Sequence, residues 1–77
     1  MKSHINITLL LKKEKFDLRI PIELRVKDLL KELYDIFGDE LLNKECNLKV
    51  INKDFIILNN EYLKDYPLSN GDLIEII

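Results

Sequence analysis

The cysteine and the histidine of this sequence are the side chains best suited to nucleophilic or metal chemistry, and neither stands in a recognisable motif. Cys46 is the only cysteine and His4 the only histidine. A catalytic nucleophile needs a base beside it, and a structural metal site needs a cluster of nitrogen, sulfur or carboxylate ligands. We therefore expect Cys46 to be a small buried or half-buried hydrophobic residue that forms no intramolecular disulfide. We predict no catalytic residue, no cofactor, no metal and no enzymatic activity.

The composition is that of one folded domain without the charge that nucleic-acid binding needs. The chain has 77 residues, of which 47% are hydrophobic and 34% charged, and its formal net charge is −2. This length is near the lower limit at which a single core suffices. The 12 basic residues are scattered among 14 acidic ones, whereas a phosphate-binding surface is basic. We expect a single domain over residues 1–77 and no nucleic-acid partner.

The start of the chain and its apolar segments bear on localisation. No segment reaches the roughly 20 apolar residues of a membrane-spanning helix. The first residues, Met1 to His4, lead into an alternating pattern and lack the apolar block of a signal peptide. We therefore expect a cytoplasmic protein with no direct membrane insertion.

Alternating apolar residues near the start predict a pair of antiparallel strands. The alternation runs through residues 4–11 and again through 16–20, with the period of a half-buried strand. Pro21 should end the second strand. The polar segment 12–15 is short enough for a hairpin connection, although it lacks the Asn-Gly signal of the tightest turns.

The period of the hydrophobic residues changes to that of an amphipathic helix after residue 25. The apolar residues at helical spacing are Val26, Leu29, Leu30, Leu33, Ile36 and Phe37. Gly38 fits a left-handed cap at the carboxyl end. At the amino end, neither Leu24 nor Arg25 offers the side-chain oxygen of a usual cap, so this end should be weakly capped.

The second half of the chain predicts three more strands. Residues 48–51 and 55–57 are short apolar segments, residues 62–66 look like a short helical turn, and 73–77 form a closing strand. This order places all helical mass on one face of a mixed sheet. If the last strand pairs parallel to the first, both lie centrally against the helix. We therefore predict an α+β fold, the β-grasp or ubiquitin-like architecture, with four to five strands and one main helix.

Four short motifs, in their order and spacing, carry a family resemblance. The segment Leu63-Lys64-Asp65-Tyr66 is similar to the Leu-x-Asp-Tyr turn of ubiquitin-like domains. The start, His4-Ile5-Asn6-Ile7-Thr8, and the later Val50-x-x-Lys53 and Asn70-Gly71-Asp72-x-Ile74-Glu75-Ile76-Ile77 resemble the YukD/EsaB family. These are small ubiquitin-like proteins encoded with type VII secretion systems of Gram-positive bacteria. The chain departs from the family at the helix entry, where Leu24-Arg25 replaces a proline.

The resemblance implies an accessory or regulatory component of such a secretion system. Ubiquitin-type modifiers and sulfur carriers react through a flexible C-terminal Gly-Gly, and here Gly38 and Gly71 are the only glycines. The branched Ile76 and Ile77, expected in the closing strand, cannot supply a flexible tail. YukD-like proteins also lack the diglycine. The alternative is a ubiquitin-like modifier or sulfur carrier whose C-terminal tail is missing from this sequence.

Protein binding is the remaining function class, and the pleat of the strands predicts its place. In a β-grasp the last strand lies between the first and the third, so their outward residues adjoin on the face without a helix. Most of these residues are large and apolar, and exposed apolar surface often marks an interaction site. The predicted docking residues are Thr8, Leu10, Lys49, Ile51, Leu73 and Ile77.

Several alternatives to this interpretation stay open. Leu42 or the long loop after the helix could cover the docking residues, or a shift of the strand register by one residue would swap the faces. Thr8 could be only a good strand former. The same face could also make a homodimer. We expect a monomer or a weak homodimer whose partners are protein components of a secretion machine.

Overall fold

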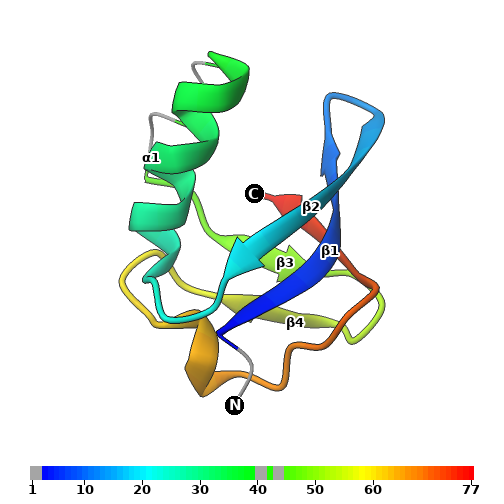
Figure 1. The fold of residues 1–77 in the computed structure, drawn as a ribbon, viewed down its shortest axis with the longest axis vertical. Helices are drawn as coiled ribbons and strands as arrows, with labels where there is room; N and C mark the ends of the chain where they lie inside the picture. The colour runs from blue at the N-terminus through cyan, green and yellow to red at the C-terminus, as the bar shows by residue number, and fades with distance from the viewer. Residues whose placement is uncertain (1–2, 40–41, 43–44) are drawn as a thin grey trace.

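The computed structural model describes residues 3–39, 42 and 45–77, whose strands form one five-stranded mixed sheet. The elements in chain order are β1 (His4–Leu11), β2 (Glu14–Pro21), α1 (Val26–Phe37), β3 (Leu48–Val50), β4 (Phe55–Ile57), the 3-10 helix η2 (Leu63–Asp65) and β5 (Asp72–Ile76). The strand order across the sheet is β2-β1-β5-β3-β4, with β5 parallel to β1 and the other neighbours antiparallel. α1 packs on one side of this sheet (Figure 1). This is the predicted β-grasp arrangement.

One apolar core lies between the sheet and α1. The inward residues of β1 and β5 are buried as their alternation predicted, and Leu42 joins them. The prediction for Ile36 is wrong, because this side chain is 68% exposed. Its neighbour Phe37 takes the inward position against Phe16, with ring centroids 4.9 Å apart. Ile36 stands in the last turn of the helix, on the side of Leu29 but two turns later, so its exposure depends on what packs against the end of α1 and not on the helical period.

The turn between β1 and β2 is tighter than the sequence predicted. The second strand begins at Glu14 rather than at Phe16, because Leu11 pairs with Glu14 and leaves only two residues in the turn. These residues, Lys12 and Lys13, have φ values of 49° and 67°. Two positive φ values are typical of the hairpin turn that usually holds Asn-Gly. The strand register therefore holds two lysines in a strained backbone conformation.

Replacing Lys13 with glycine should raise the free energy of unfolding by about 0.5–1 kcal/mol. The left-handed conformation costs most residues roughly 1–2 kcal/mol, and glycine avoids this cost while adding some entropy to the unfolded chain. Urea denaturation of Lys13→Gly would measure the gain. The control is Lys15→Gly, which places glycine inside β2 and should be destabilising. A loss of stability in both variants would show that the turn is not strained.

A distant loop caps the amino end of α1. Arg25 occupies the N-cap position without a side-chain cap hydrogen bond, as predicted. The amides of Val26 and Lys27 donate instead to the carbonyls of Glu61 and Asn59, at 3.0 and 2.9 Å. A helix leaves its first four amides without internal partners. The loop before η2 therefore supplies the acceptors that the local sequence lacks.

Backbone pairing continues past the ends of β3 and β5. Both strands end one residue earlier than predicted, before Ile51 and Ile77. The Ile51 amide still donates to the Leu73 carbonyl at 2.8 Å, and the amide and carbonyl of Ile77 both pair with Asn47.

The carboxyl end of α1 has the predicted left-handed cap. Gly38, which follows the last helical residue, has a φ of 66°.

Candidate functional site

The predicted docking residues lie on the face of the sheet opposite α1. Thr8 pairs with Leu73 across β1 and β5, and Ile51 bonds to Leu73 from the other side. These three residues form one row across the sheet. Their inward neighbours, including Leu9 and Ile74, are buried in the core. The strand register is therefore the predicted one, and the faces are not swapped.

A second row crosses the same face and has a charged centre. Leu10 and Lys49 lie on either side of Glu75, the next outward residue of β5. Lys15 extends the row on β2, and Ile56 extends it on β4. Opposite charges on neighbouring strands attract each other. The apolar side chains of this face are thus divided by the pair of Lys49 and Glu75.

Exposure differs among the apolar docking residues. Leu10, Ile51 and Leu73 are half-buried, whereas Ile77 is 46% exposed. Leu42 does not cover this face, because it lies in the core and is 2% exposed. Among these four apolar residues, Ile77 is therefore the one most accessible to a protein partner.

The sequence pattern did not point to two exposed apolar residues on the same face. Ile56 lies opposite Lys49 and is 46% exposed, and Leu58, at the next outward position of the pleat, is 50% exposed. Residues 55–58 do alternate between the two faces, but a three-residue strand is too short for its alternation to stand out. Ile56 and Leu58 extend the open face toward β4.

Thr8 has a contact that explains it without a partner. Its hydroxyl donates to Oδ1 of Asp17 at 2.9 Å, across the β1–β2 pair. Hydrogen-bonded cross-strand pairs stabilise a sheet. This bond favours the strand-pairing interpretation of Thr8 over a direct role in binding.

A buried carboxylate positions the row that contains Leu73. The Asp72 side chain is 2% exposed and accepts hydrogen bonds from Asn52 Nδ2 at 2.9 Å, Lys53 Nζ at 3.0 Å and the Ser69 amide at 2.9 Å. Asn52 Oδ1 in turn accepts the Leu73 amide at 2.9 Å. The turn after β3 and the start of β5 are thereby held together, with Leu73 between them.

The Asp72 carboxyl group remains ionised in this buried position. Burial by itself raises its pKa, but the hydrogen bonds from Asn52, Ser69 and Lys53, together with the Lys53 charge, outweigh burial. The pKa therefore lies below the ordinary value of 3.8. Lys53 and Asp72, which belong to the motifs of the family resemblance, form an ion pair whose carboxylate is buried and whose lysine side chain is 31% exposed.

His4 and Cys46 have ordinary surroundings. Cys46 is 6% exposed, which confirms the prediction of a buried residue, and its carbonyl accepts Asn59 Nδ2 at 2.8 Å. His4 is exposed at the start of β1, with Nδ1 3.0 Å from the Ser3 hydroxyl. Among the residues that the structure describes, no three His, Cys, Asp or Glu side chains gather in a group that could hold a metal ion.

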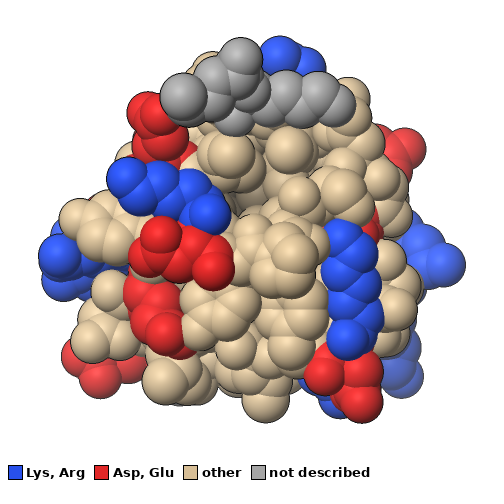
Figure 2. Space-filling view, turned by 90° about the horizontal axis from the view of Figure 1, so that it is seen from below, with Lys and Arg blue, Asp and Glu red and all other residues tan. Residues whose placement is uncertain are grey.

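Charges of both signs are mixed over the surface shown in Figure 2. Lysine and arginine side chains stand next to aspartate and glutamate around an uncharged central area. The described part of this face therefore lacks the basic surface that nucleic-acid binding needs. Within residues 3–39, 42 and 45–77, no helix is both long enough and apolar enough to pass through a membrane.

Sequence relatives place these features in a family. Residues 4–76 match the family model of YukD, a protein of the WXG100 protein secretion system. The type VII secretion system accessory factor EsaB of Staphylococcus aureus strain Newman is 26% identical over 62 residues. This alignment covers 80% of the present chain and 78% of the relative.

Solved structures share the fold. The ubiquitin-like domain of the Mycobacterium tuberculosis type VII secretion system protein EccD1 has a TM-score of 0.66 and 14% identity, with 99% of each chain covered. A chain from work on molecular mimicry of SUMO in DNA repair has a TM-score of 0.78 and 20% identity, over 100% of this chain and 94% of that one. At these identities the likeness concerns the fold alone. Because the family model spans nearly the whole sequence, this protein belongs to the YukD family of the WXG100, or type VII, secretion systems.

Proposed function

We propose that this protein is a cytoplasmic accessory or regulatory component of a Gram-positive type VII secretion system, and that it works by reversible docking onto another protein of the machine. Membership of the YukD family and the likeness to the accessory factor EsaB support the choice of system. The observation that carries the docking mode is the set of apolar side chains on the sheet face opposite α1, among them Ile56 and Ile77, each 46% exposed.

The composition of this face suits a reversible protein contact. Ile56, Leu58 and Ile77 supply the most exposed apolar area. Glu75 and Lys49 add charges that can orient a partner and reject a wrong one. Protein interfaces combine apolar contacts with polar and charged groups, as this face does. The half-buried Leu10 and Leu73 complete the contact area.

The Asp72 carboxylate and the Thr8 hydroxyl are both engaged by other residues of the fold, which favours a binding role over a catalytic one. The most strongly held carboxylate, Asp72, is 2% exposed, so a substrate could not reach it. Perturbed pKa values occur in structural ion pairs as well as in active sites, and here the partners Asn52 and Lys53 belong to a turn that the ion pair secures. The Thr8 hydroxyl is likewise engaged, by Asp17. We therefore assign these groups to the fold and not to catalysis.

Polar substitutions on the sheet face should reduce secretion while the fold is kept. In a strain that carries the variant Leu10→Gln/Ile51→Thr/Ile77→Thr at the native locus, we expect at least about a tenfold loss of secreted WXG100 protein, because a few apolar residues carry most of the energy of an interface. Immunoblots of culture supernatants and of cells measure the effect. Circular dichroism of the purified variant checks the fold.

The matched control for this variant is Ile36→Thr. Ile36 is 68% exposed but belongs to α1, on the other side of the sheet. Secretion should stay at the wild-type level in this control. Normal secretion by the folded triple variant would sink the docking proposal, and a loss confined to Ile36→Thr would move the contact to the helix.

A further inference from the structure

The sheet ends at β2, which is a long and regular edge strand. β2 has eight residues and pairs with β1 without interruption, from Pro21 opposite His4 to Glu14 opposite Leu11. Among the residues that the structure describes, no strand lies on its other side. The strand at the opposite edge, β4, has only three residues. An edge strand presents a row of backbone amides and carbonyls to which another strand can add.

The backbone groups at this edge belong to Lys15, Asp17 and Arg19. Just past β2, the Ile22 amide donates to the Ser3 carbonyl at 3.0 Å, in continuation of the β1–β2 register. Opposite residues of an antiparallel pair alternate between bonded and non-bonded pairs, so the even-numbered residues of β2 bond to β1. The amides and carbonyls of Lys15, Asp17 and Arg19 therefore point away from β1, where an added strand would lie.

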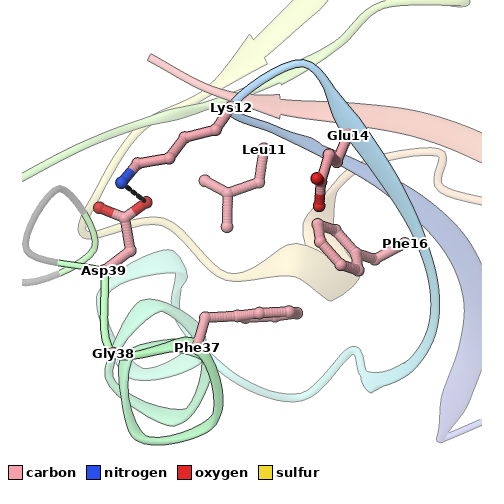
Figure 3. A pocket seen from close by; sticks show the side chains of 7 residues that line it. All are labelled: Leu11, Lys12, Glu14, Phe16, Phe37, Gly38 and Asp39. Carbon is pink, nitrogen blue, oxygen red and sulfur yellow. Dashed lines mark ion pairs between the residues drawn. The ribbon is translucent and has the colours of Figure 1, made fainter.

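The side chains of β2 differ on its two faces. Those on the open face are exposed and alternate in charge: Lys15, Asp17 and Arg19. On the α1 side, Phe16 and Leu18 are half-buried. Phe16 lies against Phe37 at the end of α1 (Figure 3), with ring centroids 4.9 Å apart. The edge thus offers apolar side chains on one face and charges of both signs on the other.

We propose that β2 pairs with β2 of a second copy of this chain. In this dimer the two strands run antiparallel, with Asp17 of each copy opposite Arg19 of the other. Because one strand carries charges of both signs, a copy of that strand can complement it, and opposite charges on neighbouring strands attract each other. On the α1 side, Leu18 then lies against its counterpart and Phe16 lies opposite Ile20.

The charges select this register over its neighbours. A dimer centred on Asp17 would join the strands over the same length, but it would place Lys15 opposite Arg19 and the two Asp17 side chains opposite each other. Like charges directly opposite destabilise a sheet. A dimer centred on Phe16 would pair Lys15 with Asp17, but over a shorter stretch of strand. In the proposed register Lys15 faces Pro21, whose missing amide ends the contact.

The contact between the copies is small. Asp17 and Arg19 both point their amides and carbonyls outward, so each pair of these residues exchanges both backbone hydrogen bonds. One pair of strands buries little area compared with a stable interface. We therefore expect a reversible dimer that forms at high protein concentration.

The dimer joins the two docking faces, a consequence that rests on the proposed function. In this register open-face residues lie opposite open-face residues, so the sheet faces of the two copies form one continuous surface. A partner with two binding sites then gains affinity without any new contact, because its second site binds intramolecularly.

Sedimentation equilibrium of the purified full chain over a wide range of concentrations tests the proposal. The average mass should rise from that of a monomer toward that of a dimer. Arg19→Asp sets two carboxylates opposite each other at both central pairs and should raise the dissociation constant about tenfold. A wild-type protein that stays monomeric at every concentration would overturn the proposal, as would an unchanged constant in Arg19→Asp.

The matched control is Lys15→Glu, which makes the same change of net charge on the same face of β2. Because Lys15 lies opposite Pro21 in the proposed register, the dissociation constant should stay at the wild-type value. A tighter dimer in this control would favour the register centred on Asp17, and a weaker one the register centred on Phe16. Either result would contradict the pairing of Asp17 with Arg19.

A mixture of two self-repelling variants makes the test specific. Asp17→Arg sets two arginines opposite each other and should associate as weakly as Arg19→Asp. The two variants together should form a mixed dimer, because every central pair then joins an arginine to an aspartate. No mixed dimer, from two variants that keep the circular dichroism of the wild type, would rule out pairing of β2 with itself.

Hydrogen exchange locates the contact along the chain. As the concentration rises, exchange should slow at the amides of Lys15, Asp17 and Arg19, which point outward. The amides of Phe16 and Leu18 bond to β1 and should exchange slowly at every concentration. A dimer without slower exchange at the three outward amides would place the contact elsewhere and overturn the proposal.

The sheet-face variant separates this dimer from the docking proposal. Leu10→Gln/Ile51→Thr/Ile77→Thr leaves the residues of β2 unchanged and should dimerise as the wild type does. Loss of the dimer in this variant would assign self-association to the sheet face and not to β2. Normal secretion by the same variant, with its dimer retained, would contradict docking and leave the pairing of β2 supported.

Discussion

Replacing Asp72 with asparagine should lower the free energy of unfolding by about 2–3 kcal/mol, because it removes a buried carboxylate that accepts several hydrogen bonds, one of them from a partly exposed lysine. The side chain is 2% exposed, and its oxygens accept hydrogen bonds from Asn52, Lys53 and the Ser69 amide. An asparagine amide would turn a donor toward groups that are themselves donors. The Lys53 ammonium would lose the charge that balances it. Urea denaturation near neutral pH measures this loss.

The pH dependence of the loss identifies its cause. The folded-state pKa of Asp72 lies below its ordinary value of 3.8, so its ionised form stabilises the fold. That stabilisation is fully present above the unfolded-state pKa and disappears as the pH falls through the folded-state value. The difference between wild type and Asp72→Asn should therefore be largest near neutral pH and shrink below about pH 4.

The control for this substitution is Asp35→Asn, which makes the same change at an exposed position of α1. It should alter the free energy of unfolding by less than about 0.5 kcal/mol. A similar loss in both variants would mean that charge reduction, and not the buried network, is responsible. A difference for Asp72→Asn that persists undiminished in acid would assign the effect to another group.

Replacing Leu63 with alanine should destabilise the protein by about 3–4 kcal/mol. Leu63 is 0% exposed in η2, and removing a fully buried leucine costs the lost burial and leaves a cavity. A domain of this size has a total stability of only about 5–10 kcal/mol. A large fraction of its resistance to urea should therefore disappear, and equilibrium unfolding measures the fraction.

Loss of Leu63 should also loosen the start of α1. The Leu63 amide donates to the Leu24 carbonyl at 3.0 Å, and the loop before it supplies the acceptors for Val26 and Lys27. Two further hydrogen bonds hold this loop: the Glu61 carboxylate accepts them from the Tyr66 hydroxyl and the Leu58 amide. They lower the pKa of the Glu61 carboxyl group. Hydrogen exchange at the amides of residues 26 and 27 should be faster in Leu63→Ala.

Leu58→Ala is the matched control, since it makes the same substitution in the same loop at a side chain that is 50% exposed. Its cost should stay below about 1 kcal/mol. Equal losses in the two variants would show that Leu63 does not anchor this loop. Unchanged exchange at residues 26 and 27 in Leu63→Ala would show that the cap does not depend on it.

The sequence by itself determined which segments are strands and helix and, with the exception of Ile36, which side chains of β1 and α1 face the core. Alternation along β1 separated the buried Ile7 and Leu9 from the outward Thr8 and Leu10, and the register of the sheet agrees. The left-handed cap at Gly38 was also predictable. These features depend on the period of the chain and on the backbone freedom of glycine, which are local properties.

The tertiary structure alone decided how the ends of the elements are satisfied. The positive φ values of Lys12 and Lys13 follow from the register of β1 and β2, because no residue in that turn prefers them. The cap of α1 comes from Asn59 and Glu61, which lie far along the chain. The burial of Asp72 likewise depends on its donors. Each of these contacts joins distant segments, so a local pattern cannot predict it.

The same division holds for the open face. The pleat of the strands placed Leu10, Ile51 and Leu73 on this face, but only the packing of neighbouring strands makes them half-buried. Ile56 reaches the face because β4 pairs with β3 opposite Lys49. A residue's face follows from the period of its own strand, whereas its exposure depends on which other strands lie beside it. The sequence could therefore name the face, and the fold determined which of its side chains a partner can reach.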